Sequence, residues 1–267
     1  MGMTDGLKVT LKSIGLQNRT SRHIVIDGSD SDDVVNYCRK NFPEVEVHIR
    51  NPRGIYEAMN FGLSLISEDS WVLFLNEGDF LLGEDALWCL TEGSEVSKTW
   101  SYGSTIAFEL NSSKREIYGR ESTDWSVLKR GKLLIPHPST AVRLNCINRV
   151  QGFRRIFAIA ADIDLMYRIF LKFGPPTYVA RIISAHELGG ISSSSRIRSK
   201  SESLIIRIMN FPKDTAMAFM SKLLLFNFQS ESKAWLETNT LFPQLAHYTA
   251  CERLGHYPVC CRNSILS

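Results

Sequence analysis

The sequence lacks the features that mark several large classes of protein. Its six cysteines form no C-x-x-C pair, and their spacing suits neither a zinc site nor a disulfide framework in a chain of 267 residues. No uncharged apolar run reaches the roughly 18 residues that a membrane-spanning helix needs. Residues 1–6 lack the charged and apolar regions of a signal peptide. We therefore expect a cytoplasmic protein with reduced thiols, either soluble or peripheral at the inner face of the membrane.

A large excess of charge of either sign is also absent. The 31 basic and 28 acidic residues leave a net charge of +3, which does not indicate nucleic acid as a partner. There is no G-x-G-x-x-G fingerprint, so a nicotinamide-dependent oxidoreductase is remote. What the sequence does have is 44% hydrophobic and 22% charged residues, which is typical of a globular domain and excludes disordered and fibrous classes.

The N-terminal part of the chain alternates between β-rich runs and helical patterns. Strands are predicted at residues 23–27, 45–49 and 71–75, and helices at residues 6–16, around 34–38 and at 55–66. Such close alternation favours an α/β fold with a mostly parallel sheet covered by helices on both faces. Ligands bind such sheets at the carboxyl ends of the strands.

The pattern changes beyond Gly83. We expect a helix from Glu84, strands near residues 101–108 and 115–118, a loop at 135–139 and a helix at 160–173. The Gly/Ser-rich run at 189–195 is typical of a mobile loop. A boundary near residue 200 then separates a domain of residues 1–200 from a helical extension of residues 201–267. The apolar stretch at 214–228 either packs on that domain, the commoner outcome, or rests on a membrane.

Two acidic residues follow strands of the predicted sheet. Asp27 ends the run HIVID, and Asp79 follows WVLFL within the segment NEGD. In a parallel sheet both lie at the edge where ligands bind. Asp is also an ordinary turn former after a strand, and either position alone favours that simpler interpretation. Their coincidence at one edge favours a functional site.

Five segments resemble, in the same order, motifs of the GT-A glycosyltransferases of family 2. HIVIDGSDSDD resembles the family's IVIDGGSTDGT, RGIYEAMNFGL its KGIYDAMNKGI, and WVLFLNEGDFL its YILFLNAGDxL. HPSTAVR is similar to HPSTFFR, and QGFRRIFAIAADIDLMYRIF to GGFDERFRIAADYDLMLRLF. Each motif alone is weakly specific, but together they span residues 6–194. The residues that follow match no such motif.

The resemblance implies transfer of a sugar, usually a hexose, from a nucleotide diphosphate donor to an acceptor hydroxyl. Inversion at the anomeric carbon and a place in polysaccharide or glycoconjugate biosynthesis are implied as well. The implied partners are a nucleotide-sugar and a glycan or lipid-linked acceptor. The implied cofactor is Mg²⁺ or Mn²⁺, which offsets charge on the leaving diphosphate. The alternative is a non-catalytic GT-A remnant that binds a partner protein or glycan.

The resemblance also assigns roles to particular residues. Asp79 matches the family's metal-binding acid, and Asp27 the acid that contacts the donor nucleotide. Asp162 matches the acid that takes the proton from the acceptor hydroxyl, and His137 matches a histidine on the acceptor side. The remaining positions implied on the donor side are Arg53, Gly54, Asn60 and Asn76.

Several of these residues also suit a structural role. Asp162 and Asp164 both stand in the first turn of a predicted helix, where the helix dipole favours acids. The resemblance favours catalysis for Asp162, and helix initiation is the simpler role for Asp164. For Asp32 we favour an N-cap. Tyr56 and Met59 are expected to be packing residues.

Two further groups follow the predicted domain's last motif. His186 is a candidate second metal ligand, by analogy with the C-terminal histidine of some GT-A enzymes. Arg196, Arg198 and Lys200 either clamp the diphosphate on loop closure or form a solvated basic face, which is the commoner explanation.

The family's first strand, of the type SIIIPTYN, stands ahead of the helix that begins here near Gly6. Only five residues precede Gly6, so we expect that strand to be absent from the sheet. A start codon placed too far downstream and a genuine loss both explain this. Without the strand, an interior strand becomes an exposed edge and donor affinity falls.

Overall fold

The computed structural model describes residues 5–51, 53–67, 69–93, 99–109, 112–119, 123–126, 135–188 and 196–211. The chain divides into two compact units, Met1–Ala216 and Met217–Ser267, and all described residues belong to the first. The expected loop at 189–195 and the stretch at 214–228 lie outside the described residues. The boundary expected near residue 200 falls inside α9 (Arg196–Asn210), because Ile206 of this helix is buried in the main core.

The first elements follow the alternation that the sequence predicts. They are α1 (Asp5–Gly15), β1 (Ile24–Asp27), α2 (Asp33–Asn41), β2 (Glu46–Ile49) and α3 (Ile55–Ser64). β1 and β2 pair in parallel, with Ile24 opposite Glu46 and Asp27 opposite Ile49. The crossover through α2 that parallel pairing requires is therefore present.

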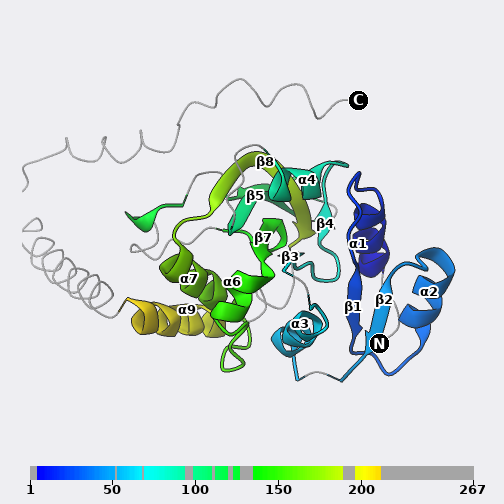
Figure 1. Cartoon of the computed structure of the whole chain (residues 1–267), viewed down its shortest axis with the longest axis horizontal. Helices are drawn as coiled ribbons and strands as arrows, with labels where there is room; N and C mark the ends of the chain where they lie inside the picture. The colour runs from blue at the N-terminus through cyan, green and yellow to red at the C-terminus, as the bar shows by residue number, and fades with distance from the viewer. Residues whose placement is uncertain are drawn as a thin grey trace, which may run out of the picture. The chain divides into compact units, whose positions relative to one another are not determined.

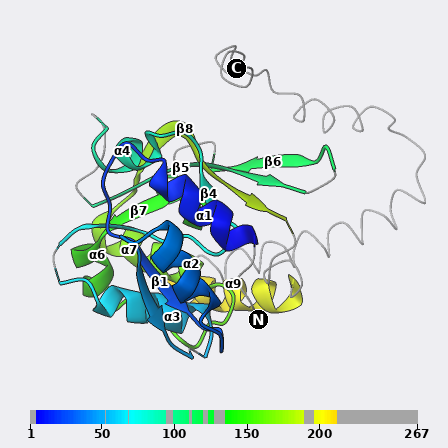
Figure 2. The same cartoon turned by 90° about the vertical axis from the view of Figure 1, so that its right-hand side faces the viewer.

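A second sheet is built from the strands that follow. It contains β3 (Trp71–Leu73), β4 (Phe80–Leu81), β5 (Trp100–Phe108), β6 (Arg115–Tyr118), β7 (Thr140–Arg143) and β8 (Thr177–Glu187), in the order β3-β7-β5-β8-β4 with β6 on β5. Figure 2 shows the ribbon that β5 and β6 form. Of its pairs only β5–β8 is parallel. This sheet is mixed rather than mostly parallel, because β7 returns between β3 and β5.

The helices of the second half cover this sheet. They are α4 (Ala86–Thr91), the 3₁₀ turn η1 (His137–Ser139), α6 (Leu144–Arg149), α7 (Ala161–Phe173) and α9. Figure 1 shows α7 and α9 side by side, and they are in contact. None of the helices in the described part of the chain is long and apolar enough to cross a membrane.

The buried side chains form three separate hydrophobic clusters. The largest packs α3, α6, α7 and α9 against β3, β5 and β7 around Trp100, Tyr167 and Phe170. A second lies between α4 and the larger sheet, and a third joins α1 and α2 to the smaller sheet. Each cluster contains one buried cysteine with a free thiol, namely Cys146, Cys89 and Cys38 in the same order.

A cavity of about 920 Å³ lies between the two sheets. Among the described residues β1 pairs only with β2, and β3 pairs only with β7, so each has an open edge. Val25 of β1 and Leu73 of β3 line the cavity, together with Leu7, Leu11 and Ile14 of α1. Its walls therefore combine apolar side chains and unpaired strand edges, which suit an additional strand, with polar residues that include Arg22, Asp27 and Asp69.

We expect that a strand supplied ahead of α1 joins the two sheets. A turn and a β-rich segment of about five residues, fused to the N-terminal end, would pair with the open edges. Thermal melts should show a rise in Tm of about 5 °C or more. A Gly/Ser-rich extension of equal length is the control. Equal melting temperatures for the two extended chains would contradict the expectation.

Candidate functional site

Asp27 ends β1 with one carboxylate oxygen unused. The side chain is 7% exposed, and its Oδ1 accepts the backbone N–H of Ser29 at 2.9 Å. Its Oδ2 is buried and accepts no hydrogen bond within the described part of the chain. The loop that follows β2 lies beside it, because the Arg50 N–H donates to the Asp27 carbonyl at 2.8 Å. A buried acceptor without a donor is costly, so this oxygen is available for a ligand.

Asp79 is held in a tight turn after β3. Its Oδ2 accepts the backbone N–H of Asn76 at 2.9 Å, and its own N–H donates to the Asn76 carbonyl at 3.0 Å. α1 fixes the turn, since the Thr10 hydroxyl donates to the Asp79 carbonyl at 2.7 Å and accepts the Gly78 N–H at 3.1 Å. Burial outweighs the Asn76 contacts and raises the pKa of Asp79 to about 6. The side chains of Asn76 and Glu77 are exposed.

His186 of β8 lies across the sheet from this turn. Phe80 of β4 pairs with Ala185 in antiparallel register, so Asp79 and His186 are the residues next to this pair at the same end of the two strands. The His186 Nδ1 is buried and has no hydrogen-bond partner among the described residues. Burial lowers the pKa of His186, which favours the neutral imidazole that binds metals.

These two residues fit a divalent cation as partial ligands. A carboxylate and a neutral imidazole suit Mn²⁺, and Mg²⁺ and Mn²⁺ take further ligands from water and phosphate. No group of three or more His, Cys, Asp or Glu side chains with metal-binding geometry occurs among the residues that the structure describes. The orphaned His186 nitrogen is the observation that favours a ligand here, because a buried polar atom normally has a partner.

Asp162 stands in the first turn of α7 and is oriented by Tyr56 of α3. The Tyr56 hydroxyl lies 3.0 Å from the Asp162 Oδ1 and 2.6 Å from the Ile159 carbonyl, so one phenol proton serves two acceptors. Burial and the nearby Asp162 charge raise the pKa of Tyr56, which keeps the phenol protonated. The Asp162 Oδ2 accepts no hydrogen bond from described residues. Sequence reasoning expected Tyr56 only to pack.

Tyr56 joins Asp162 to a cluster of aromatic rings. Tyr56 stacks on Phe153 at 5.4 Å, and Phe74 meets the edge of Phe153 at 5.0 Å. His137 stacks on Phe74 at 5.6 Å, with an interplanar angle of 13°. Burial lowers the pKa of His137, and the charge of Asp162 opposes this effect. His137 thus belongs to the same aromatic cluster as Tyr56, which contacts Asp162, and the charge of Asp162 acts on it. Phe74 of this cluster lies two residues ahead of Asn76 and the Asp79 turn.

The turn that carries His137 is anchored from inside the sheet. The hydroxyl of Ser139 lies 2.5 Å from that of Thr105 and 2.7 Å from that of Ser184, and it also lies 3.0 Å from the Ser104 carbonyl. All of these side chains are buried. Polar contacts to β5 and β8 thus fix η1, in addition to its flanking prolines.

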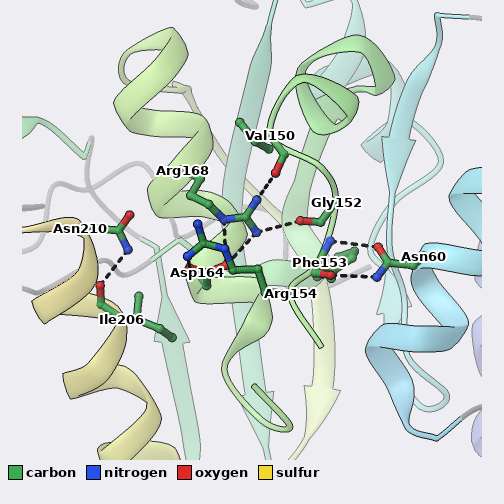
Figure 3. Close-up of polar contacts among 9 residues, drawn as sticks. All are labelled: Asn60, Val150, Gly152, Phe153, Arg154, Asp164, Arg168, Ile206 and Asn210. Atoms are coloured by element: carbon green, nitrogen blue, oxygen red, sulfur yellow. Dashed lines mark hydrogen bonds and ion pairs between the residues drawn. The ribbon is translucent and has the colours of Figure 1, made fainter. Parts of the chain in front are cut away.

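Asn60 holds the loop that presents Phe153. Its Nδ2 donates to the Phe153 carbonyl at 2.8 Å, and its Oδ1 accepts the Phe153 N–H at 2.9 Å (Figure 3). The side-chain amide is occupied by this backbone, whereas the resemblance implies a donor contact. Its role in the structure is to fix Phe153, which belongs to the aromatic cluster beside Asp162.

Asp164 is fully buried between two arginines. Arg168 approaches its Oδ2 at 2.7 Å and Arg154 its Oδ1 at 3.3 Å (Figure 3). Arg168 also donates to the carbonyls of Val150 and Gly152. Asp164 therefore binds α7 to the preceding loop, instead of the expected role at the helix start.

The remaining expected residues have varied surroundings. Gly54 begins α3 with a φ of 133°, a conformation that favours glycine, and the exposed Arg53 precedes it. The expectation that the Asp32 side chain caps α2 is wrong: Asp32 occupies the cap position without a capping bond, while Asp33 accepts a bond from Ser31. Met59 packs on the main core as expected.

The basic segment begins α9. Arg198 pairs with Glu202 at 3.0 Å, and the side chain of Arg196 lies outside the described residues. Sequence reasoning did not identify Glu202, Phe74 or Phe153. The only signals were the aromatic positions inside two of the family-like motifs.

We expect Tyr56→Phe to destabilise the protein by about 1–2 kcal/mol, because two acceptors lose their donor while the ring still stacks on Phe153. The free energy of unfolding from urea titrations measures this. Tyr37→Phe is the matched control, since the Tyr37 ring contacts Phe42 and its hydroxyl bonds to none of the described residues. Equal losses in the two variants would show that the Tyr56 hydroxyl contributes nothing.

Comparison with known sequences gives relatives of one kind. No family model matches the chain. Two curated proteins do: the uncharacterized glycosyltransferases MT1564 and Rv1514c of Mycobacterium tuberculosis strains CDC 1551 and H37Rv. Each is 30% identical over 196 residues, which cover 71% of this chain and 72% of the relative.

Solved structures show the same fold. S. aureus TarS 1–349 in complex with UDP-GlcNAc is 12% identical, with a TM-score of 0.55 over 79% of this chain. The chain spans 65% of that structure, slightly under two thirds. The mannosyltransferase PcManGT from Pyrobaculum calidifontis, in complex with GDP-Man and Mn²⁺, is 14% identical, with a TM-score of 0.56 over 94% of this chain and 76% of its own. By its sequence relatives and its architecture, the chain belongs to the glycosyltransferases of the GT-A fold.

Proposed function

We propose that the protein is a metal-assisted, inverting glycosyltransferase. It transfers a sugar, a hexose in the simplest case, from a nucleotide diphosphate donor to an acceptor hydroxyl during synthesis of a polysaccharide or glycoconjugate. The observation that carries the proposal is the arrangement at Asp162, a carboxylate oriented by Tyr56 within an aromatic cluster that includes Phe74, Phe153 and His137. The donors bound to TarS and PcManGT, UDP-GlcNAc and GDP-Man, support this class of substrate.

Asp162 acts as the general base in this proposal. Its Oδ2 takes the proton of the acceptor hydroxyl as that oxygen bonds to the anomeric carbon. The bond from the anomeric carbon to the donor's β-phosphate oxygen breaks, and its electron pair leaves with the nucleoside diphosphate. Attack from the face opposite the leaving group inverts the anomeric centre. The aromatic cluster beside Asp162 makes its surroundings less polar, which disfavours transfer of the sugar to water.

Asp27, Arg53 and Asp79 serve the donor. The unused Oδ2 of Asp27 accepts a hydrogen bond from the nucleoside. Arg53, ahead of Gly54, is exposed and able to reach phosphate, and the Asn76 amide is exposed beside the Asp79 turn. Asp79 and His186 would hold a divalent cation, which supplies charge neutralisation for the departing diphosphate.

A non-catalytic binding role is the second candidate. It is favoured by the division into two sheets, because no described hydrogen-bond ladder joins the sheet that ends at Asp27 to the sheet whose β3–β4 turn carries Asp79. A screen of the purified protein against UDP-, GDP- and dTDP-sugars, with Mn²⁺ or Mg²⁺, separates the two. Release of nucleoside diphosphate supports the transferase. Donor binding without release supports the remnant.

We expect Asp162→Asn to lower the turnover number by roughly 10²- to 10⁴-fold, the usual contribution of a general base. Donor binding measured by calorimetry should stay, because in this proposal Asp162 meets the acceptor hydroxyl and other residues bind the donor. Asp33→Asn is the matched control, since Asp33 is an exposed acid in the first turn of α2. Unchanged turnover in Asp162→Asn, with the protein folded and the donor bound, would remove Asp162 from the mechanism.

We expect Asp79→Asn to stabilise the metal-free protein while removing its response to metal. The folded-state pKa of Asp79 is raised from 3.8 to about 6, so the carboxylate destabilises the fold progressively as the pH rises through that interval. Above it the cost is on the order of 3 kcal/mol, which a neutral amide avoids.

Thermal melts at about pH 7.5 test this, because Asp79 is ionised at a pH about 1.5 units above its folded-state pKa. The variant should have the higher Tm without additives. Wild-type protein should gain stability from Mn²⁺ and a nucleoside diphosphate together, because binding to the folded state raises Tm. A variant that keeps this joint shift would show that Asp79 does not hold the ion.

A further inference from the structure

Glu202 of α9 receives three consecutive backbone N–H groups from the segment ahead of α7. Its Oε1 accepts the N–H of Ala158 at 3.1 Å, and its Oε2 accepts those of Ile159 at 2.9 Å and Ala160 at 3.0 Å. The side chain is 9% exposed. Successive N–H groups that converge in this way form an anion-binding concavity, and a carboxylate fills it here.

The local sequence of α7 explains why a distant carboxylate is needed. Its N-cap is Ala160, which has no side chain able to accept a hydrogen bond, and no capping bond is present. Helix N-termini leave backbone N–H groups unpaired and carry partial positive charge. Glu202, 42 residues further along the chain than Ala160, meets both requirements from another helix.

The held segment leads directly to Asp162. Ile159 donates its N–H to Glu202, while its carbonyl accepts from the Tyr56 hydroxyl at 2.6 Å. The same hydroxyl lies 3.0 Å from the Asp162 Oδ1. The Ile159 carbonyl and the Ala160 N–H belong to one peptide group, and that N–H also donates to Glu202. A shift of this peptide group therefore changes how the phenol proton is shared between Ile159 and Asp162.

α9 is itself firmly attached at this point. Ile206 is buried in the main core, and Phe211 packs against Tyr167 of α7 at 5.6 Å. Figure 3 shows α9 beside α7, with Ile206 and Asn210 labelled on α9. Burial favours the neutral form of Glu202, but the three N–H groups and Arg198 outweigh it and hold its pKa below the ordinary value. The carboxylate is therefore ionised at neutral pH.

We propose that Glu202 is a positioning residue for the reaction, which sets the geometry of Asp162 through the Ile159 peptide and Tyr56. The proposal rests on the proposed role of Asp162 as general base. It assigns α9, which follows the Gly/Ser-rich run at 189–195, a part in catalysis without contact with either substrate. The simpler alternative is that Glu202 only stabilises the fold.

The test compares Glu202→Gln with Arg198→Gln. The glutamine places an N–H₂ group against backbone N–H groups, so the Ala158–Ala160 segment loses part of its anchor. Arg198→Gln removes the arginine partner, which is 63% exposed, and leaves the carboxylate on the segment. If Glu202→Gln fails to fold, Glu202→Asp keeps the charge and shortens the reach.

For Glu202→Gln we expect kcat to fall about tenfold to hundredfold, the cost of a misplaced catalytic group. The KM for the donor should stay within about twofold, because the donor contacts lie on other elements. Hydrogen exchange at the amides of residues 158–160 should become about ten times faster or more. Glu202→Asp should fall between wild type and Glu202→Gln, and Arg198→Gln should match wild type.

Two results would overturn the proposal. Unchanged exchange at residues 158–160 would show that the carboxylate does not hold the segment. Faster exchange with kcat unchanged per folded molecule would show a purely structural role. Asp162→Asn is measured alongside. If Asp162→Asn retains turnover, the proposed general base is wrong. If Asp162→Asn loses turnover and Glu202→Gln does not, only the role of Glu202 is wrong.

Discussion

The buried charge of Asp164 is the constraint around which α7, α3 and the loop between α6 and α7 are arranged. A carboxylate with no exposure to solvent needs charge compensation and hydrogen bonds on both oxygens. Arg168 and Arg154 supply them, and Arg168 uses its other N–H groups on the carbonyls of Val150 and Gly152. The loop before Phe153 is thereby fixed to α7, and Asn60 fixes Phe153 to α3. α3, α7 and the loop before Phe153 are thus linked to one another beside the aromatic cluster.

The carboxylates of the structure fall into two groups by how completely they are satisfied. Asp164 and Glu202 accept several hydrogen bonds each, and both tie one element to another. Asp27 and Asp162 each keep an oxygen that accepts nothing from the described residues. Asp79 has one backbone donor and a pKa raised by burial. Incomplete satisfaction occurs at the positions proposed to meet substrate or metal, as expected where a ligand supplies the missing partner.

Sequence periodicity predicted the first five elements closely, because their apolar positions follow helical or strand spacing without interruption. It did not predict β4, β7, β8 or α6. β4 has only two residues, and β7 and α6 follow one another directly within ten residues. β8 is long but carries Arg181 and Glu187 among its apolar residues, and its path across β5 includes register shifts. Strand direction was also beyond reach, because a buried strand has the same composition in parallel and antiparallel pairs.

The candidate site was predictable as a set of positions more than as a set of contacts. Motif similarity singled out Asp27, Asp79, Asp162 and His137, and in the structure the charge of Asp162 acts on His137. It gave no information about what each side chain touches, so Tyr56 was assigned to packing and Asn60 to the donor. Glu202 lies outside every motif. Its relation to Ala160 exists only once α9 packs on α7, which no local pattern encodes.

The three hydrophobic clusters each enclose one cysteine, and this gives the protein a set of internal reporters. Burial raises the pKa of Cys38, Cys89 and Cys146, so little thiolate is present at neutral pH and reagents reach the sulfur only when the surrounding cluster opens. The rate at which each thiol is alkylated therefore measures the opening of its own cluster. Cys38 belongs to the cluster beside the smaller sheet, and Cys146 belongs to the main cluster, which contains Tyr56 and Phe153. Unequal rates would reveal that the two sheets unfold as separate cooperative units within one chain.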